Sequence, residues 1–138
     1  MKTDIQKQGF TLIEILVVAT IIALLAGGAA VTYSQFSRQS RDAKRKADLE
    51  EVRAALEMYR STNNTYPNGN WSNLSILTGT TKYIQSLPTD PKSGYTYAYS
   101  GTASDYTLGA YLEGGGTACG LSCGTANCNY CLGPYGKK

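Results

Sequence analysis

The sequence predicts an α+β protein in which one long N-terminal helix packs on a small antiparallel sheet, followed by a cysteine-rich C-terminal loop. Three observations predict this fold class. Residues 10–31 form a nearly unbroken apolar run, residues 49–59 keep a helical spacing of apolar side chains, and residues 95–99 and 106–112 alternate as strands do. The helix is therefore expected to be apolar in its first half and amphipathic in its second.

Composition limits the functions that the chain can have. Its 138 residues carry a net charge of +3, so its composition is not that of a strongly basic nucleic-acid-binding protein. It has no histidine, which removes the most common general base and the most common zinc ligand. Because no Ser-His-Asp, Cys-His or phosphate-loop arrangement is visible either, we expect a protein that is not an enzyme and has no cofactor.

The apolar run is long enough to span a membrane. About 20 apolar residues cross the hydrocarbon core of a bilayer as a helix, and Glu14 is the only side chain within residues 10–31 that can ionise. An ionisable group in such a segment is a functional hypothesis by default. A cut between Gly9 and Phe10 would create an α-amino group at the same membrane depth, and the amine of one copy could then neutralise Glu14 of another.

Residues 7–14, Lys-Gln-Gly-Phe-Thr-Leu-Ile-Glu, resemble the leader and processing site of type IV pilins and of the pseudopilins of type II secretion. In that family a membrane-embedded prepilin peptidase cuts after the glycine and methylates the new N-terminus. The resemblance implies cleavage after Gly9, methylation of Phe10 and a role of Glu14 in assembly. The alternatives are an uncleaved anchor and a secretory signal peptide cut near residues 28–30, although Glu14 inside the apolar run argues against the signal peptide.

The resemblance also implies an organisation for the whole chain. Residues 1–9 would be the leader, residues 10–33 a transmembrane and filament-core helix, and residues 34–138 an extracytoplasmic globular domain that includes the second half of the helix. The chain would cross the cytoplasmic (inner) membrane once with its N-terminus in the cytoplasm, and would then leave the lipid for an extracytoplasmic filament. The implied partners are the prepilin peptidase, identical subunits, minor pilins or pseudopilins, and an inner-membrane assembly platform.

The helix is expected to run from about residue 11 to about residue 60. Its second half carries an apolar stripe at three- and four-residue steps, made of Leu49, Val52, Leu56 and Tyr59. Five cations before this stripe are expected to form a solvated face near the lipid headgroups: Arg38, Arg41, Lys44, Arg45 and Lys46. By the positive-inside rule these cations would place the C-terminal part in the cytoplasm, which conflicts with the resemblance.

The segments after the helix predict a small sheet. Turn-forming residues 63–67 end the helix. Between the helix and the strands we expect a short helical or irregular connection, an extended piece and a turn, at residues 71–77, 83–87 and 88–94. The two tyrosine-rich strands would form a hairpin that covers the apolar stripe. Trp71 and the tyrosines could instead form a carbohydrate-binding surface, although aromatic residues that alternate along strands usually belong to a core.

A second resemblance concerns metal binding. Residues 87–91, Leu-Pro-Thr-Asp-Pro, and the tyrosines after them are similar to the segment before the sheet in major pseudopilins. In that subfamily a loop after the last strand commonly binds calcium through carboxylates and carbonyls. The corresponding residues 113–118 offer only Glu113, whereas calcium takes several oxygen ligands. We therefore expect no metal ion, calcium included.

The C-terminal region contains a cluster of four cysteines, Cys119, Cys123, Cys128 and Cys131. We favour two disulfides, which persist in an extracytoplasmic setting and would stabilise a glycine-rich tail with little apolar material. The sequence leaves three connectivities open. A zinc site of four thiolates is the alternative, although the separation between its two halves is shorter than in zinc fingers, and a redox Cys-x-x-Cys centre at Cys128 and Cys131 is the third option.

These features predict a structural subunit of a type IV pilus-like or type II secretion pseudopilus filament. The tyrosine-rich strands favour a pseudopilin, whereas the cysteine-bearing tail and the shortage of calcium ligands favour a pilin, so both possibilities stay open. The alternative from another class is a membrane-tethered zinc-binding or redox module that uses the cysteine cluster, with the helix serving only as its anchor.

Overall fold

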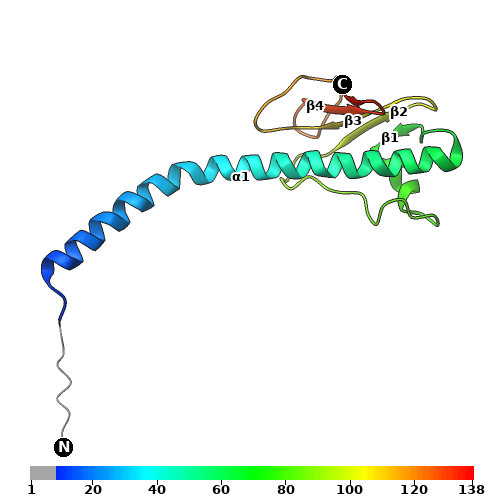
Figure 1. The fold of residues 1–138 in the computed structure, drawn as a ribbon. Helices are drawn as coiled ribbons and strands as arrows, with labels where there is room; N and C mark the ends of the chain where they lie inside the picture. Colours follow the sequence, from blue (N-terminus) through cyan, green and yellow to red (C-terminus); the bar gives the residue numbers. More distant parts are fainter. Residues whose placement is uncertain (1–8) are drawn as a thin grey trace, which may run out of the picture. The chain divides into compact units, whose positions relative to one another are not determined.

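The computed structural model describes residues 9–138, without side-chain detail at residues 29–31 (Figure 1). Residues 1–8 of the expected leader lie outside the described residues. The elements in chain order are helix α1 (Leu12–Asn63), strand β1 (Gly69–Asn70), 3-10 helix η1 (Trp71–Thr78), and strands β2 (Ala98–Gly101), β3 (Tyr106–Ala110), β4 (Tyr130–Gly133) and β5 (Gly136–Lys137). The described residues form two compact units, residues 9–37 and 38–138, and α1 contributes to both.

Helix α1 begins with a capping box. The Glu14 backbone N–H donates to Thr11 Oγ1 at 3.3 Å, and the Thr11 N–H donates to Glu14 Oε2 at 3.4 Å, so two backbone donors that the helix leaves free are satisfied. The helix ends at Asn63, and Asn64 follows in the left-handed conformation with φ 57°, which asparagine tolerates better than most residues. The predicted long helix is confirmed, with its end three residues beyond the expected position.

The first unit consists of the apolar half of α1. Every described side chain of residues 10–36 is exposed. Among the described residues, α1 is the only helix long and apolar enough to cross a membrane. A helix surface of this kind is stable in a cell only when lipid or other protein covers it.

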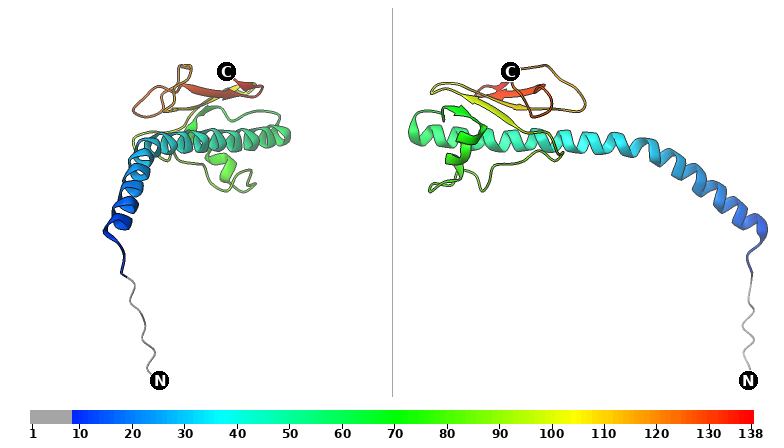
Figure 2. Two further views of the ribbon diagram at one scale, coloured as in Figure 1. Left: turned by 60° about the vertical axis from the view of Figure 1, so that its left-hand side comes forward. Right: turned by 180° about the vertical axis from the view of Figure 1, so that it is seen from behind.

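The second unit contains a five-stranded sheet in the order β1-β2-β3-β4-β5, with every neighbouring pair antiparallel. Figures 1 and 2 show the sheet along one side of the second half of α1, with η1 and the segment after it along the other side. The predicted hairpin is present as β2 and β3, although β2 begins at Ala98, later than expected. The predicted extended piece at residues 83–87 is wrong, because no strand forms there.

The sheet is larger than the predicted hairpin because the C-terminal region contributes strands. β4 and β5 come from a segment that was expected to be a loop. β1 and β5 are two residues each and consist of Gly, Asn and Lys, so they pair through their backbones and show no alternation of apolar side chains.

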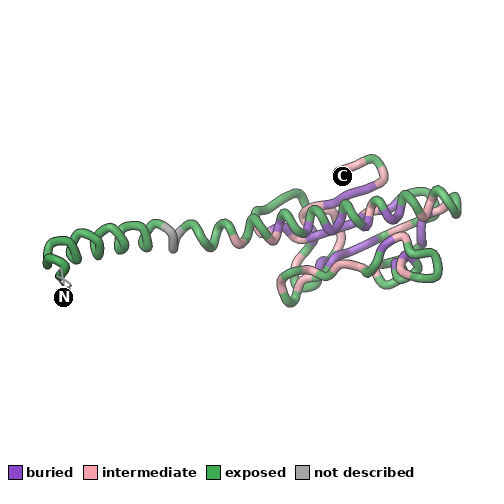
Figure 3. The backbone as a smooth tube through the Cα atoms, turned by 60° about the horizontal axis from the view of Figure 1, so that its bottom comes forward, coloured by how far each residue is buried: buried purple, intermediate pink, exposed green. Residues whose placement is uncertain are grey.

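The core of the second unit packs around the second half of α1, against the sheet and against η1. Leu49, Val52 and Leu56 of α1 are fully buried, as the apolar stripe predicted. Sheet residues and residues before the sheet complete the core, among them Tyr66, Tyr97, Tyr99, Tyr106, Leu108 and Leu132. Figure 3 shows this burial along one side of the second half of the helix. Four tyrosines are thus core residues, and Trp71 packs against them half-buried, with its ring 5.6 Å from that of Tyr97.

Candidate functional site

The predicted processing site precedes α1. Gly9 and Phe10 have no regular secondary structure, and both are exposed. A Cβ added at Gly9 would have no neighbouring atom within 4 Å. The Gly9–Phe10 peptide bond is therefore accessible to a peptidase, and a new amine at Phe10 would lie close to the start of the helix.

Glu14 has a local partner that we did not predict. The capping box with Thr11 uses its carboxylate in the isolated chain. The sequence signal for this role is the Thr-x-x-Glu pattern of residues 11–14, which marks helix N-termini. Glu14 thus caps its own helix, while its exposed side chain stays accessible to a second chain.

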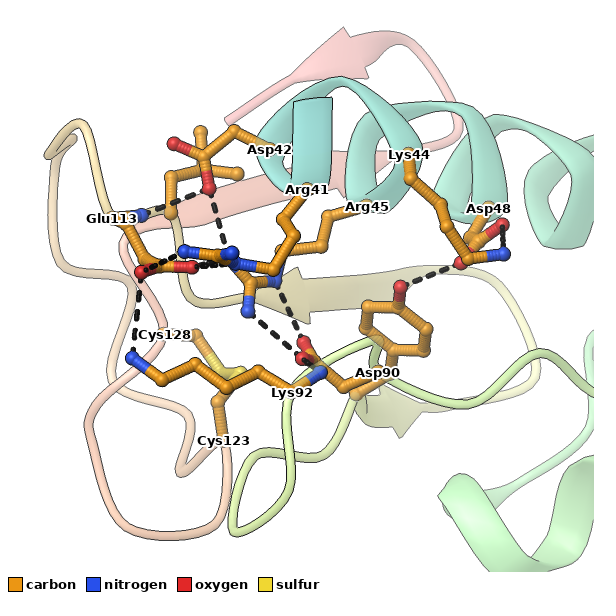
Figure 4. A network of polar contacts seen from close by, with 12 residues as sticks. Arg41, Asp42, Lys44, Arg45, Asp48, Asp90, Lys92, Glu113, Cys123 and Cys128 are labelled. Carbon is orange, nitrogen blue, oxygen red and sulfur yellow. Dashed lines mark hydrogen bonds and ion pairs between the residues drawn. A yellow bond between two sulfur atoms is a disulfide. The ribbon is translucent and has the colours of Figure 1, made fainter. Parts of the chain in front are cut away.

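The expected solvated basic face is wrong for Arg45. Its side chain is 0% exposed and lies at the centre of a network of ion pairs (Figure 4). The guanidinium makes a two-pronged contact with Asp90, with Nε and Nη2 each 2.8 Å from a carboxylate oxygen. Nη1 donates to Asp42 at 2.9 Å and to Glu113 at 3.0 Å. The hydrogen bond to Asp90 raises the pKa of Arg45 despite its burial, so this side chain remains charged.

Glu113 receives two further cations in the same network. Arg41 donates to its two carboxylate oxygens at 2.6 and 2.8 Å, and Lys92 donates at 3.4 Å. The hydrogen bonds from Arg41, and then from Arg45 and Lys92, lower the pKa of Glu113 from 4.5 to about 2, although burial acts in the opposite direction. We refer to the six residues Arg41, Asp42, Arg45, Asp90, Lys92 and Glu113 as the Arg45 network.

The network fastens the loop that follows β3 to the helix. Asp42 accepts hydrogen bonds from the backbone N–H groups of Glu113 at 2.9 Å and Gly114 at 2.8 Å. Asn129 holds the residue just before this point, because its side chain accepts from the Leu112 N–H and donates to the Leu112 carbonyl. The start of this glycine-rich loop is therefore fixed by charged side chains of α1 and by an amide.

Tyrosine hydroxyls join the sheet to acidic residues of α1. Tyr97 donates to Asp48 at 2.6 Å within the core. Tyr66 and Tyr106 both donate to Glu57, at 2.9 and 3.1 Å. Burial, followed by the interactions with these carboxylates, raises the pKa of Tyr97 and of Tyr106 well above the ordinary value, so both hydroxyls remain protonated donors.

All four cysteines of the chain are paired. The structure joins Cys119 to Cys131 and Cys123 to Cys128, with Cα–Cα distances of 6.3 and 5.1 Å. No thiolate is left to bind zinc. Within the described part of the chain, no group of three or more His, Cys, Asp or Glu residues is arranged to hold a metal ion.

The disulfides cover the sheet face opposite the helix. Tyr97 and Tyr99 belong to the core under α1, whereas Ala98 between them belongs to a second cluster with three of the cysteines. Gly109 lies directly across from Ala98 on one side and from Cys131 on the other. A Cβ at Gly109 would lie 2.8 Å from Cys128 Sγ, so small residues on this face make room for the sulfur atoms.

A separate basic feature surrounds the ring of Tyr130 in β4. Lys46 Nζ of α1 is 5.7 Å from the ring centre of Tyr130, and Lys137 Nζ of β5 is 5.8 Å from the same ring. Both lysines are exposed, and neither forms an ion pair with another described residue. Sequence reasoning missed this site because Lys46 is far along the chain from Tyr130 and Lys137.

Comparison with known families gives two matches. Residues 32–127 match the family described as type IV minor pilin ComP, DNA uptake sequence receptor. Residues 6–30 match the prokaryotic N-terminal methylation motif. The first match covers more than half of the chain, and the second covers the predicted processing site.

Similar proteins include the type II secretion system core proteins G of several bacteria. The protein of Vibrio cholerae is 30% identical over 142 residues, covering 92% of this chain and 97% of the relative. The protein of Pseudomonas aeruginosa is 35% identical over 129 residues, covering 81% of this chain and 89% of the relative. No solved structure gives a significant match. The chain belongs to the family of type IV pilins and type II secretion pseudopilins, the structural subunits of pili and pseudopili.

Proposed function

We propose that this chain is cleaved after Gly9 by a prepilin peptidase, methylated on Phe10, and assembled with identical copies into a filament through residues 10–33. The observation that carries the proposal is the position of the processing sequence. It lies directly before an apolar helix whose described apolar side chains are all exposed. Bundling with the same helix of other copies buries that surface again when it leaves the lipid.

Before assembly, the chain crosses the inner membrane once, with its N-terminus in the cytoplasm and residues 34–138 outside. The two disulfides support this orientation, because such bonds persist in oxidising compartments. The count of flanking cations favours the opposite orientation. Labelling of intact cells with a membrane-impermeant amine reagent distinguishes the two orientations. The exposed lysines of residues 34–138 react only if this domain is outside.

During docking, the Glu14 carboxylate pairs with the Phe10 amine of a neighbouring subunit. Both groups lie at the same end of an apolar segment, where an unpaired charge is costly. The pairing adds an intermolecular role to the local capping role of Glu14. Minor subunits and a membrane platform are the further partners expected of such a filament.

Two substitutions of Glu14 separate these roles. Glu14→Gln keeps a side chain that can complete the capping box but removes the charge, whereas Glu14→Ala removes both. In cells that assemble the wild-type chain, we expect both variants to leave little or no protein in the sheared filament fraction, and to keep both disulfides and normal membrane levels. Normal filaments from Glu14→Gln would assign Glu14 to helix capping alone.

DNA binding is a second candidate function, because the family matched by residues 32–127 is described as a DNA uptake sequence receptor. The observation that favours DNA binding is that Lys46 of α1 and Lys137 of β5 both lie beside the ring of Tyr130. Two ammonium groups without acidic partners can bind phosphates, and a tyrosine ring beside them can contact a base or sugar.

The test is the salt dependence of binding to a short DNA duplex, measured by fluorescence anisotropy on the full chain in detergent. A Lys46→Gln/Lys137→Gln variant should bind weakly and lose roughly two units from the slope of log K against log salt. Lys82→Gln, which removes an exposed lysine elsewhere in the domain, is the matched control. Equal binding by the double variant and the wild type would remove this candidate.

A further inference from the structure

We propose that Arg45 takes the place of a structural metal ion. With Arg41 and Lys92 it supplies the positive charge that holds the loop after β3 and the segment before β2 against α1, so the domain reaches full stability without calcium. This inference does not depend on filament assembly. It concerns the loop in which the similarity to major pseudopilins implied a calcium site.

Arg45 lies where three segments of the chain meet. Its guanidinium contacts one carboxylate from each of three segments: Asp42 of α1, Asp90 of the connection before β2, and Glu113 of the loop after β3. Figure 4 shows these carboxylates converging on it. A bound divalent cation joins chain segments by the same means, through shared carboxylate oxygens. The planar fork of arginine does so with hydrogen bonds of defined direction.

Every carboxylate oxygen of the Arg45 network already accepts a hydrogen bond. Asp90 accepts from Arg45 through both oxygens and also from the Lys92 backbone N–H. The two oxygens of Asp42 accept from Arg45 and from the backbone N–H groups after β3. Glu113 accepts from cations through both oxygens. Calcium takes 6–8 oxygen ligands, so it would have to displace hydrogen bonds that already exist.

The charges of the Arg45 network balance. The Arg45 network holds three cations and three carboxylates, so its formal charge is zero. Adding a divalent cation would leave two uncompensated positive charges beside a side chain that is fully buried, which is unfavourable. The residues present therefore do not fit calcium. Removing Arg45 would leave the three carboxylates facing one another with one cation too few.

The direct test compares thermal unfolding of the full chain in detergent, with excess EDTA and with millimolar CaCl2 at matched ionic strength. MgCl2 serves as the control for a general effect of divalent ions. Because a ligand that binds only the folded state raises the melting temperature, we expect the two temperatures to agree within about 1 °C. A rise of several degrees in CaCl2 alone would overturn the proposal.

A pair of variants tests whether Arg45 fastens the loop. Arg45→Met removes the central cation, and Arg53→Met removes an arginine of the same helix whose ion pair with Glu50 is exposed. We expect Arg45→Met to lower the melting temperature by roughly 10 °C or more and Arg53→Met by far less. Equal effects would contradict the role of Arg45.

Amide hydrogen exchange supplies a local readout. The backbone N–H groups of Glu113 and Gly114 donate to Asp42, which Arg45 holds in place. In Arg45→Met these amides should exchange much faster, and in Arg53→Met at the wild-type rate. If Arg45→Met yields no folded protein, the milder Lys92→Met, which removes a half-exposed cation from Glu113, should accelerate the same amides; unchanged exchange would contradict the proposal.

Discussion

Asp48 joins α1 to the residue just before β2 by a short, buried polar contact. Its side chain is largely buried, and it accepts the hydrogen bond from Tyr97 at 2.6 Å while Lys44 lies 3.7 Å away. A hydrogen bond to a charged acceptor stabilises a protein more than one between neutral groups. Tyr97 therefore contributes through its hydroxyl as well as through its ring.

Tyr97→Phe should lower the free energy of unfolding by about 1.5–3 kcal/mol, because it leaves a buried carboxylate short of a donor. Tyr99→Phe is the matched control. Its hydroxyl donates to the neutral carbonyl of Pro67 at 2.6 Å, so its loss should cost about 1 kcal/mol. Urea unfolding measures both, and a smaller loss for Tyr97→Phe than for Tyr99→Phe would contradict the importance of the charged acceptor.

The sequence did not reveal which charged residues are buried. Asp48 and Arg45 lie among exposed charges at helical spacing, where a solvated face is the usual interpretation. Arg45 is covered by Asp90 and Glu113, which are 45 and 68 residues away along the chain. Asp48 is covered by Tyr97, which is 49 residues away. Contacts over such separations depend on the final fold. The Thr11–Glu14 capping box, by contrast, was readable from its local spacing.

At the scale of elements, β4 is the strand that depends most on the disulfides. It lies between β3 and β5 and contains Cys131, which is bonded to Cys119 in the preceding loop. Residues 111–129 have no strand of their own and are held by the two disulfides, by Asn129 and by two isolated bridges. A long segment with so few apolar residues needs such covalent links.

Replacing Cys119 and Cys131 by alanine should destabilise the domain by about 2–4 kcal/mol. The loss should be uneven, with faster amide exchange in β4 and β5 and little change in β2 and β3. The Cys123–Cys128 disulfide closes a shorter loop, with a sequence separation of 5 against 12 for Cys119–Cys131. Its removal in Cys123→Ala/Cys128→Ala should therefore destabilise the domain less. Exchange that increases uniformly over the sheet in the first variant would contradict a local role.

The elements that the sequence predicted are those with strong local periodicity. The long helix and the β2–β3 hairpin follow from apolar spacing over many residues. β1 and β5 could not be predicted, because two-residue strands carry no period. The cysteines predicted disulfides but not their pairing, which depends on Ala98 and Gly109 leaving space above the sheet. The failed strand at residues 83–87 shows that a short apolar run alone is weak support for a strand.

At the scale of the whole molecule, the globular unit depends on ionised carboxylates. The pKa of Glu113 is about 2 in the folded chain and 4.5 in its ordinary state. Because the folded-state value is the lower one, its contribution to stability is complete above pH 4.5 and is lost as the pH falls toward 2.

Urea unfolding between pH 7 and pH 2.5 should therefore show stability falling below about pH 4.5. Glu113→Gln cannot titrate, so this variant should be less stable at pH 7 and should lose less on acidification. The pKa of Asp105 is also lowered, by the hydrogen bond from Lys138, so some dependence on pH will remain. Identical pH profiles for the wild type and Glu113→Gln would contradict the contribution of the network.

The two units differ in what covers their apolar surfaces. Residues 10–33 carry the apolar surface that lipid or other subunits must cover, and residues 38–138 form a small domain held by its own core, ion pairs and disulfides. We propose that processing at Gly9 converts the apolar surface of residues 10–33 into an assembly surface.

Intact-mass and N-terminal sequence analysis of the protein isolated from membranes and from filaments tests that claim most directly. We expect a mature chain that begins at Phe10, lacks residues 1–9, and carries one methyl group on its N-terminal amine. A chain that retains Met1, or one that begins near residue 31 without a methyl group, would contradict it.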